Sequence, residues 1–263
     1  MVSLLFLAII VKSELGNNSQ IKNLLSELNI NLNFSNKDPN PVTNDDKFQE
    51  LKNKISNEEG VYGLYIKDIL NGKTYKMNVE EEFYPLSLLK LPIAYIVARD
   101  VEKGDLKWDE MLEYKYEDYF NQFGTINSFG FGSTFELKKI VELMLRESDN
   151  AAPNMLRRHL GVDYLNEEFK KISGDSTIDL FDEELVTNPE KCAFIIEGIF
   201  YKKWLSDESV NLLLGYLNPT SYDETLTPYL NSNLTFYHKV GFSTEMYHNC
   251  GIIRGENKDL ILC

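Results

Sequence analysis

The stretch "LMLRESDNAAPN", residues 143–154, is the part of the sequence that decides how the rest is interpreted. It follows a segment, 134–147, whose apolar residues recur at the period of an amphipathic helix, so this helix is predicted to end just before Ser148, Asp149 and Asn150. With average residue usage, the tripeptide S-D-N occurs by chance in roughly a few per cent of chains of this length. These three side chains are therefore candidates for a site.

A second candidate lies upstream, in "YPLSLLKLPIAY", residues 84–95. Apolar residues on every face predict a helix buried inside the protein, where the ammonium of Lys90 would have no solvent. Residues three apart share one helix face, so Ser87 and Lys90 are expected side by side. Burial favours a neutral amine that can accept a hydroxyl proton, which indicates a serine nucleophile with a lysine base.

Chance is the alternative explanation for the S-x-x-K spacing of Ser87 and Lys90. At ordinary residue frequencies, about one S-x-x-K occurs by chance in a chain of this length. A long lysine side chain can also reach out of a core to solvent. The assignment of Ser87 and Lys90 therefore depends on partners elsewhere in the chain.

A third motif lies near the C-terminus, in "YHKVGF", residues 237–242, where Lys239, Val240 and Gly241 fall on a predicted strand. In this order S-x-x-K, S-D-N and K-V-G are similar to the S-x-x-K, S-D-N and K-T-G set of class A β-lactamases and penicillin-binding proteins. Over residues 44–263 the chain thus resembles active-site serine hydrolases of the class A β-lactamase type. A "TNPE" helix start at 187–190 is similar to one common in that family.

The predicted elements lead to the same fold class without the resemblance. A helix near 48–55 and two strands around the Asn-Gly turn of 70–73 precede Ser87, helices fill most of 87–180, and strands return at 234–241, 249–255 and 259–263. Strands at both ends with helices between them predict an α+β fold. The resemblance implies an antiparallel five-stranded sheet built from both termini, flanked by helices, with an all-helical lobe inserted and the site in the cleft between them.

The resemblance also implies roles for individual residues. Ser87 would be acylated, Lys90 would be its base or proton relay, and Ser148 would pass the proton to the leaving nitrogen. Asn150 would bind the substrate's side-chain amide, Lys239 its carboxylate, and Gly241 would let the acyl chain lie against the strand. The oxyanion would be bound by the backbone N–H groups of Ser87 and Phe242. Asp149 is expected to be structural.

Two departures from the family pattern bear on activity. Val240 lacks the hydroxyl that a threonine or serine would offer to the substrate carboxylate, so recognition would rely on Ser243 and Thr244. The loop at 173–188 is short and has no E-x-E-L-N-like stretch to activate the deacylating water. Either Glu183 or Glu184 is a candidate for that role, and the alternative is that both are solvated loop carboxylates.

Three functions remain open at this point. The first is a serine hydrolase that forms an acyl-enzyme at Ser87 with β-lactams or peptidoglycan-type peptides and is weak as a β-lactamase. The second is a true class A-type β-lactamase that uses Glu183 or Glu184. The third is an inactive fold that binds a cell-wall fragment or a protein.

Composition excludes other classes of function. A net charge of −14 and the lack of a basic run argue against a nucleic acid partner. The spacing of the three cysteines and three histidines predicts neither a disulfide framework nor a metal site, so all six are expected to be structural. We expect no cofactor, no metal and a monomer whose partner is a small-molecule substrate.

The chain divides into two predicted parts. Residues 1–43 hold an apolar segment, a short helix and a linker, and 44–263 form the hydrolase domain, with a sheet lobe at 44–85 and 190–263 and a helical lobe at 86–189. The opening "MVSLLFLAIIVKS" has an apolar run of signal-peptide length without basic residues before it. Export to the cell envelope is therefore expected, with a cytoplasmic location as the alternative, and membrane contact only through this segment. The sequence stops at "KDLILC", so we expect the C-terminal helix that the resemblance implies to be missing.

Overall fold

The computed structural model describes residues 44–121, 124–176, 179–182, 184–202, 204–224, 226–256 and 258–263. The N-terminal segment predicted at 1–43 lies outside these ranges. Within the described ranges, no helix is long and apolar enough to cross a membrane.

A five-stranded sheet forms one half of the molecule, and its strand order is β2-β1-β7-β6-β5. Its strands are β1 (Leu64–Asp68), β2 (Thr74–Met77), β5 (Thr235–Phe242), β6 (Tyr247–Gly255) and β7 (Lys258–Leu262). Every pairing is antiparallel. The sheet is built from both ends of the described chain, as the sequence predicted.

Alternate residues of each strand face opposite sides of the sheet and pack into two separate cores. Tyr65, Ile252 and Ile261 face the helices, whereas their chain neighbours face a smaller core covered by α2 (Asn44–Ile55). The helix α2 contributes Phe48, Leu51 and Ile55 to this smaller core.

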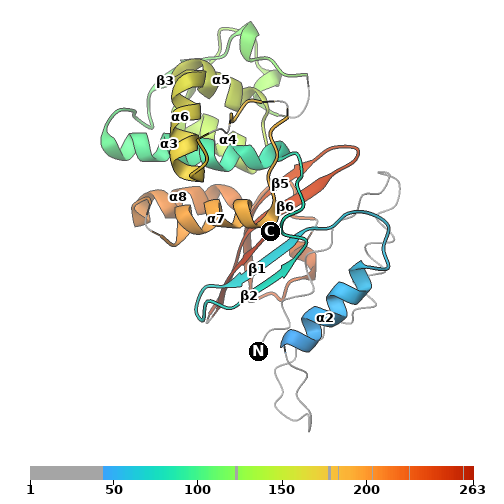
Figure 1. The fold of residues 1–263 in the computed structure, drawn as a ribbon. Helices are drawn as coiled ribbons and strands as arrows, with labels where there is room; N and C mark the ends of the chain where they lie inside the picture. The colour runs from blue at the N-terminus through green and yellow to red at the C-terminus, as the bar shows by residue number, and fades with distance from the viewer. Residues whose placement is uncertain are drawn as a thin grey trace.

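Helices cover the other face of the sheet in two layers (Figure 1). Helices α7 (Pro189–Phe200) and α8 (Asp207–Leu217) contact the strands directly, and α3 (Lys90–Lys103), α4 (Leu137–Arg146), α5 (Ala151–Leu160) and α6 (Val162–Ser173) lie beyond them. The helix start predicted at Pro189 is confirmed, because Asn188 caps α7 by accepting a hydrogen bond from the Lys191 amide at 2.8 Å. This arrangement confirms the α+β fold class.

Two local predictions were wrong. Residues Thr134–Glu136, assigned to a helix by periodicity, form strand β4, which pairs with β3 (Met111–Glu113) in a small second sheet before α4 begins. The spacing of the cysteines predicted no disulfide framework, yet Cys250 of β6 and Cys263, the residue after β7, form a disulfide with a Cα–Cα distance of 4.1 Å. Strand register brought these two residues together, and register is not visible in cysteine spacing.

Candidate active site

Ser87 lies in a short 3₁₀ turn, η2 (Leu86–Leu89), and Lys90 is the first residue of α3. Side chains three residues apart eclipse one another in such a turn, so Lys90 Nζ lies 3.1 Å from Ser87 Oγ. Leu86, just before the serine, has a φ of +51°, which a branched side chain rarely adopts. Strain of this kind is held in place by surrounding structure and is common at functional sites.

Ser148 lies in the tight connection between α4 and α5, also with a positive φ, +56°. Asp149 fixes this connection from inside the protein. One of its oxygens accepts hydrogen bonds from the amides of Ala151 and Ala152 at 2.8 and 3.0 Å, and the other from the Ile126 amide at 2.8 Å. Asp149 has no exposed surface. Its contacts support the structural role expected for it.

Lys90 joins the two motifs. Besides Ser87, its Nζ lies 3.1 Å from Ser148 Oγ, 2.6 Å from the Ser148 carbonyl oxygen and 2.6 Å from Asn150 Oδ1. Burial lowers the pKa of Lys90 to about 7, although the Asp149 carboxylate opposes this shift. A large fraction of Lys90 is therefore the neutral amine near neutral pH, and the neutral amine is the form that accepts a proton.

Lys239 enters the same cluster from strand β5. Its side chain is 1% exposed, and its Nζ lies 2.9 Å from Ser148 Oγ and 2.8 Å from the carbonyl oxygen of Val240. Burial lowers the pKa of Lys239 well below its usual value, and repulsion by Lys90 lowers it further. Ser148 Oγ thus lies between two amines, and a continuous path for protons connects Ser87, Lys90, Ser148 and Lys239.

Gly241 lets strand β5 approach η2, the turn that carries Ser87. A Cβ at this position would lie 2.9 Å from Leu86 Cβ, 3.1 Å from the Ser87 amide nitrogen and 3.3 Å from the Pro85 carbonyl oxygen. The family resemblance implied that Gly241 lets the acyl chain lie against the strand, and the structure adds that a side chain at this position would press on the turn that carries Ser87. The roles of the Ser87 and Phe242 amides in binding an oxyanion stay predictions.

A Gly241→Ala variant is expected to lose acylation rate roughly a hundredfold, because displacing the Ser87 turn by even about 1 Å disturbs the reacting geometry. Single-turnover kinetics with a chromogenic β-lactam would measure the loss. Thermal unfolding monitored in parallel should show a folded protein. An acylation rate within about twofold of the parent would mean that the tight contact of β5 with this turn does not set the geometry.

Ser243 and Glu184 lie outside the hydrogen-bonded cluster of Ser87, Lys90, Ser148 and Lys239, and Glu183 lies outside the described residues. Ser243 Oγ accepts hydrogen bonds from the amides of Glu245 and Met246, at 3.2 and 3.1 Å, and so closes the turn between β5 and β6. Glu184 is exposed, and Glu183 lies outside the described residues. No carboxylate of the described residues forms an ion pair with Lys90. In the same ranges no group of His, Cys, Asp and Glu side chains could hold a metal ion.

The fold and this cluster define a class, the serine hydrolases with a β-lactamase-like fold. The family model described as the Beta-lactamase enzyme family matches residues 46–263, and the chain belongs to this family.

Known relatives and structures agree with this assignment. The chain is 25% identical over 150 residues to a β-lactamase of Streptomyces lavendulae, which covers 55% of this chain and 49% of the relative. It is 30% identical over 146 residues to a β-lactamase of Bacillus amyloliquefaciens, which covers 55% of this chain and 45% of the relative. The chain thus spans about half the length of these curated relatives in the matched regions.

Solved structures share the fold at lower identity. The structure of PBP-A superposes with a TM-score of 0.74 at 22% identity and covers 82% of this chain and 84% of that one. An ancestral class A β-lactamase superposes with a TM-score of 0.73 at 20% identity and covers 81% of this chain and 88% of that one.

Proposed function

We propose that this protein forms an acyl-enzyme at Ser87 with β-lactams or peptidoglycan-type peptides, and that it releases the acyl group slowly. The observation that carries the proposal is the hydrogen-bonded cluster of Ser87, Lys90, Ser148 and Lys239, in which a hydroxyl faces a buried amine with a pKa of about 7. An inactive fold would have no need for two lysines buried side by side, since burying amines costs free energy. The curated relatives are named β-lactamases, and a variant of PBP-A is described as an acyl-enzyme complex with penicillin G.

The proposed reaction follows from the order of contacts. Ser87 Oγ attacks the carbonyl carbon of the substrate and gives its proton to the neutral amine of Lys90, 3.1 Å away. The proton reaches the leaving nitrogen through Ser148 Oγ as the C–N bond breaks, which leaves an ester on Ser87. The positive charge that Lys90 gains with this proton favours the developing oxyanion. Water must then cleave the ester and return a proton to the site.

Slow release is proposed because no carboxylate that could activate this water contacts Lys90 among the described side chains. Glu184 is exposed at the protein surface, and its amide is bound to Asp182 Oδ1 at 2.9 Å. Intact-protein mass spectrometry after mixing with penicillin G should therefore show a stoichiometric adduct that persists over many minutes. Fast multiple turnover would instead favour a true β-lactamase.

Replacing both Glu183 and Glu184 with glutamine is expected to change the deacylation rate by less than about threefold, against roughly a hundredfold for loss of a true general base. The decay of the penicillin adduct measures this directly. Both glutamines keep the size of the side chains, so loop packing is conserved. A steep fall in deacylation would show that one of these carboxylates reaches the water.

Recognition of the substrate carboxylate is proposed to be weak, because Val240 is buried and apolar and Ser243 Oγ is occupied in the turn. A Val240→Thr variant is expected to be acylated by penicillin G about tenfold faster, the gain of roughly one charge-assisted hydrogen bond. The methyl ester of penicillin G, which lacks the charge, is the matched control and should gain less than about twofold. Equal gains for acid and ester would contradict this explanation.

Export is also proposed, since the Cys250–Cys263 disulfide is typical of oxidising compartments. Thiol labelling of protein taken directly from cells, with acid quenching, should find one reactive thiol after unfolding. Three free thiols would contradict export.

A further inference from the structure

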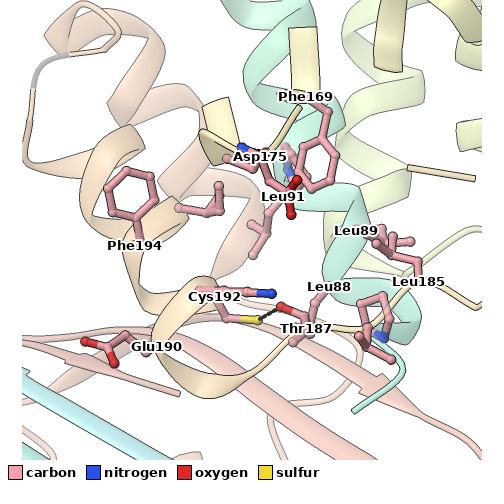
Figure 2. Close-up of a pocket in the computed structure, with 16 residues that line it drawn as sticks. Leu88, Leu89, Leu91, Phe169, Asp175, Leu185, Thr187, Glu190, Cys192 and Phe194 are labelled. Carbon is pink, nitrogen blue, oxygen red and sulfur yellow. Dashed lines mark hydrogen bonds between the residues drawn. The ribbon is translucent and has the colours of Figure 1, made fainter. Parts of the chain in front are cut away.

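A cavity of about 300 Å³ lies beside the turn that carries Ser87 (Figure 2). Leu88, Leu89 and Leu91 form one wall, Phe169 of α6 another, and Cys192 of α7 lies at its base. Neither Ser87 nor the two active-site lysines line it. The cavity is therefore separate from the catalytic cluster, although both share the same 3₁₀ turn.

The walls of the cavity favour an apolar occupant. Leucine, proline, isoleucine and phenylalanine side chains make up most of the lining. The Cys192 thiol already has a partner, Thr187 Oγ1 at 3.3 Å, and burial raises the pKa of this thiol to about 11, so it stays uncharged. Few polar groups are left on the wall to bind a polar ligand.

The charges of the lining favour a neutral occupant. Asp175, Glu190 and Lys191 line the cavity, and Glu190 is paired with Lys76. With Lys76 counted, two cations stand against the two acids, so neither a carboxylate nor an ammonium has a clear electrostatic advantage. Val186 and Phe194 also line the cavity and are 36% and 41% exposed. An apolar molecule in the cavity would cover part of this exposed surface.

We propose that this cavity binds a small, neutral, apolar molecule. The bound molecule restrains the motion of η2, the turn that carries Ser87. A cavity of about 150 Å³ holds a benzene ring, so this one is large enough for a bicyclic ring or an eight-carbon chain. An empty apolar cavity forfeits contacts that an occupant restores. Leu88 and Leu89 belong to the same turn as Ser87, so contacts with the occupant restrain the position of Ser87.

Binding is tested with 1-octanol, octanoate and octylammonium, which share one chain and differ in charge. At about 2 mM, 1-octanol is expected to raise the melting temperature of the protein by roughly 3 °C, because a ligand that binds only the folded state stabilises it. The two charged analogues should give less than a third of that shift. No shift with 1-octanol, or an equal shift with either charged analogue, would overturn the proposal for a neutral ligand.

Three variants test whether 1-octanol binds in this cavity. Ile195→Trp fills the cavity and should abolish the octanol shift. Phe194→Ala removes an exposed ring from the lining and should weaken octanol binding at least threefold, which gives a second test if the tryptophan variant does not fold. Phe129→Ala removes a ring that is similarly exposed, at 47%, and does not line the cavity. Retained binding in both cavity variants, or equal weakening by Phe129→Ala, would place the octanol elsewhere.

The effect on the turn is measured as the acylation rate of Ser87 by penicillin G. Saturating 1-octanol is expected to raise this rate at least twofold, by restraining Ser87 near Lys90. An unchanged rate with octanol bound would overturn the proposed steadying of the turn. This last measurement rests on the proposed function, whereas the melting shifts do not. A protein that binds octanol but is never labelled by penicillin would therefore refute the proposed function and leave the ligand site standing.

Discussion

A Ser87→Ala variant is expected to lose covalent labelling by penicillin G, with acylation falling about a thousandfold or more. Ser87 Oγ and Ser148 Oγ both lie 3.1 Å from Lys90 Nζ, but Ser87 is half-buried, whereas Ser148 is 4% exposed and lies between two lysines. Removing Ser87 Oγ leaves the rest of the cluster in place. Intact-protein mass spectrometry, followed by peptide mapping of any adduct, measures the loss and its position.

Ser148→Ala is the matched control, since it also deletes one hydroxyl from the same cluster. This variant should keep labelling at Ser87 but slow it, because the proton path to the leaving nitrogen is interrupted. Both variants should unfold at temperatures close to the parent. A persistent adduct on Ser148 in the Ser87→Ala variant would show that the nucleophile has been assigned to the wrong serine.

The convergence of the three motifs could be predicted from sequence because each motif lies at an identifiable position in a predicted element. Ser87 and Lys90 start a buried helix, Ser148 follows an amphipathic one, and Lys239 lies on a strand. The resemblance to a known family supplied the arrangement of these elements in space. Residue types and periodicity alone do not predict that Lys239 Nζ lies 2.9 Å from Ser148 Oγ.

The backbone strain of the site could not be predicted. Leu86 and Ser148 adopt positive φ values, yet neither residue type favours that conformation. Tertiary contacts stabilise it, since β5 packs against the Leu86 turn at Gly241 and Lys90 binds the carbonyl oxygen of Ser148. A sequence pattern reports local preference, and these two residues adopt their conformations against that preference.

The cavity beside η2 and the Cys250–Cys263 disulfide were missed for a related reason. Both depend on how distant segments meet. The cavity is lined by side chains from α3, α6 and α7, and the disulfide joins strands whose register places Gly251 opposite Leu262. The loop at 173–188 could be recognised as short from sequence, but the space beside it could not.

A Lys90→Met variant is expected to lose acylation rate by about a thousandfold, because the buried amine is the proposed acceptor of the Ser87 proton. The pH dependence of the parent should report the same group. With a pKa of about 7, Lys90 is protonated and unable to accept a proton in acid, and it becomes neutral as the pH rises. Acylation should therefore increase between about pH 6 and pH 8, with its midpoint at the pKa of about 7, and then level off.

The Lys90→Met variant should lose this pH dependence together with the rate. Lys90→Arg is the matched control for charge, since a guanidinium is a cation that stays protonated, and it should be as slow as the methionine variant. An active arginine variant would mean that positive charge, and not basicity, is required. If the rise with pH survives in Lys90→Met, it belongs to Lys239, whose pKa is lowered by the same burial and which also contacts Ser148 Oγ. That result would move the proton acceptor to the lysine on strand β5.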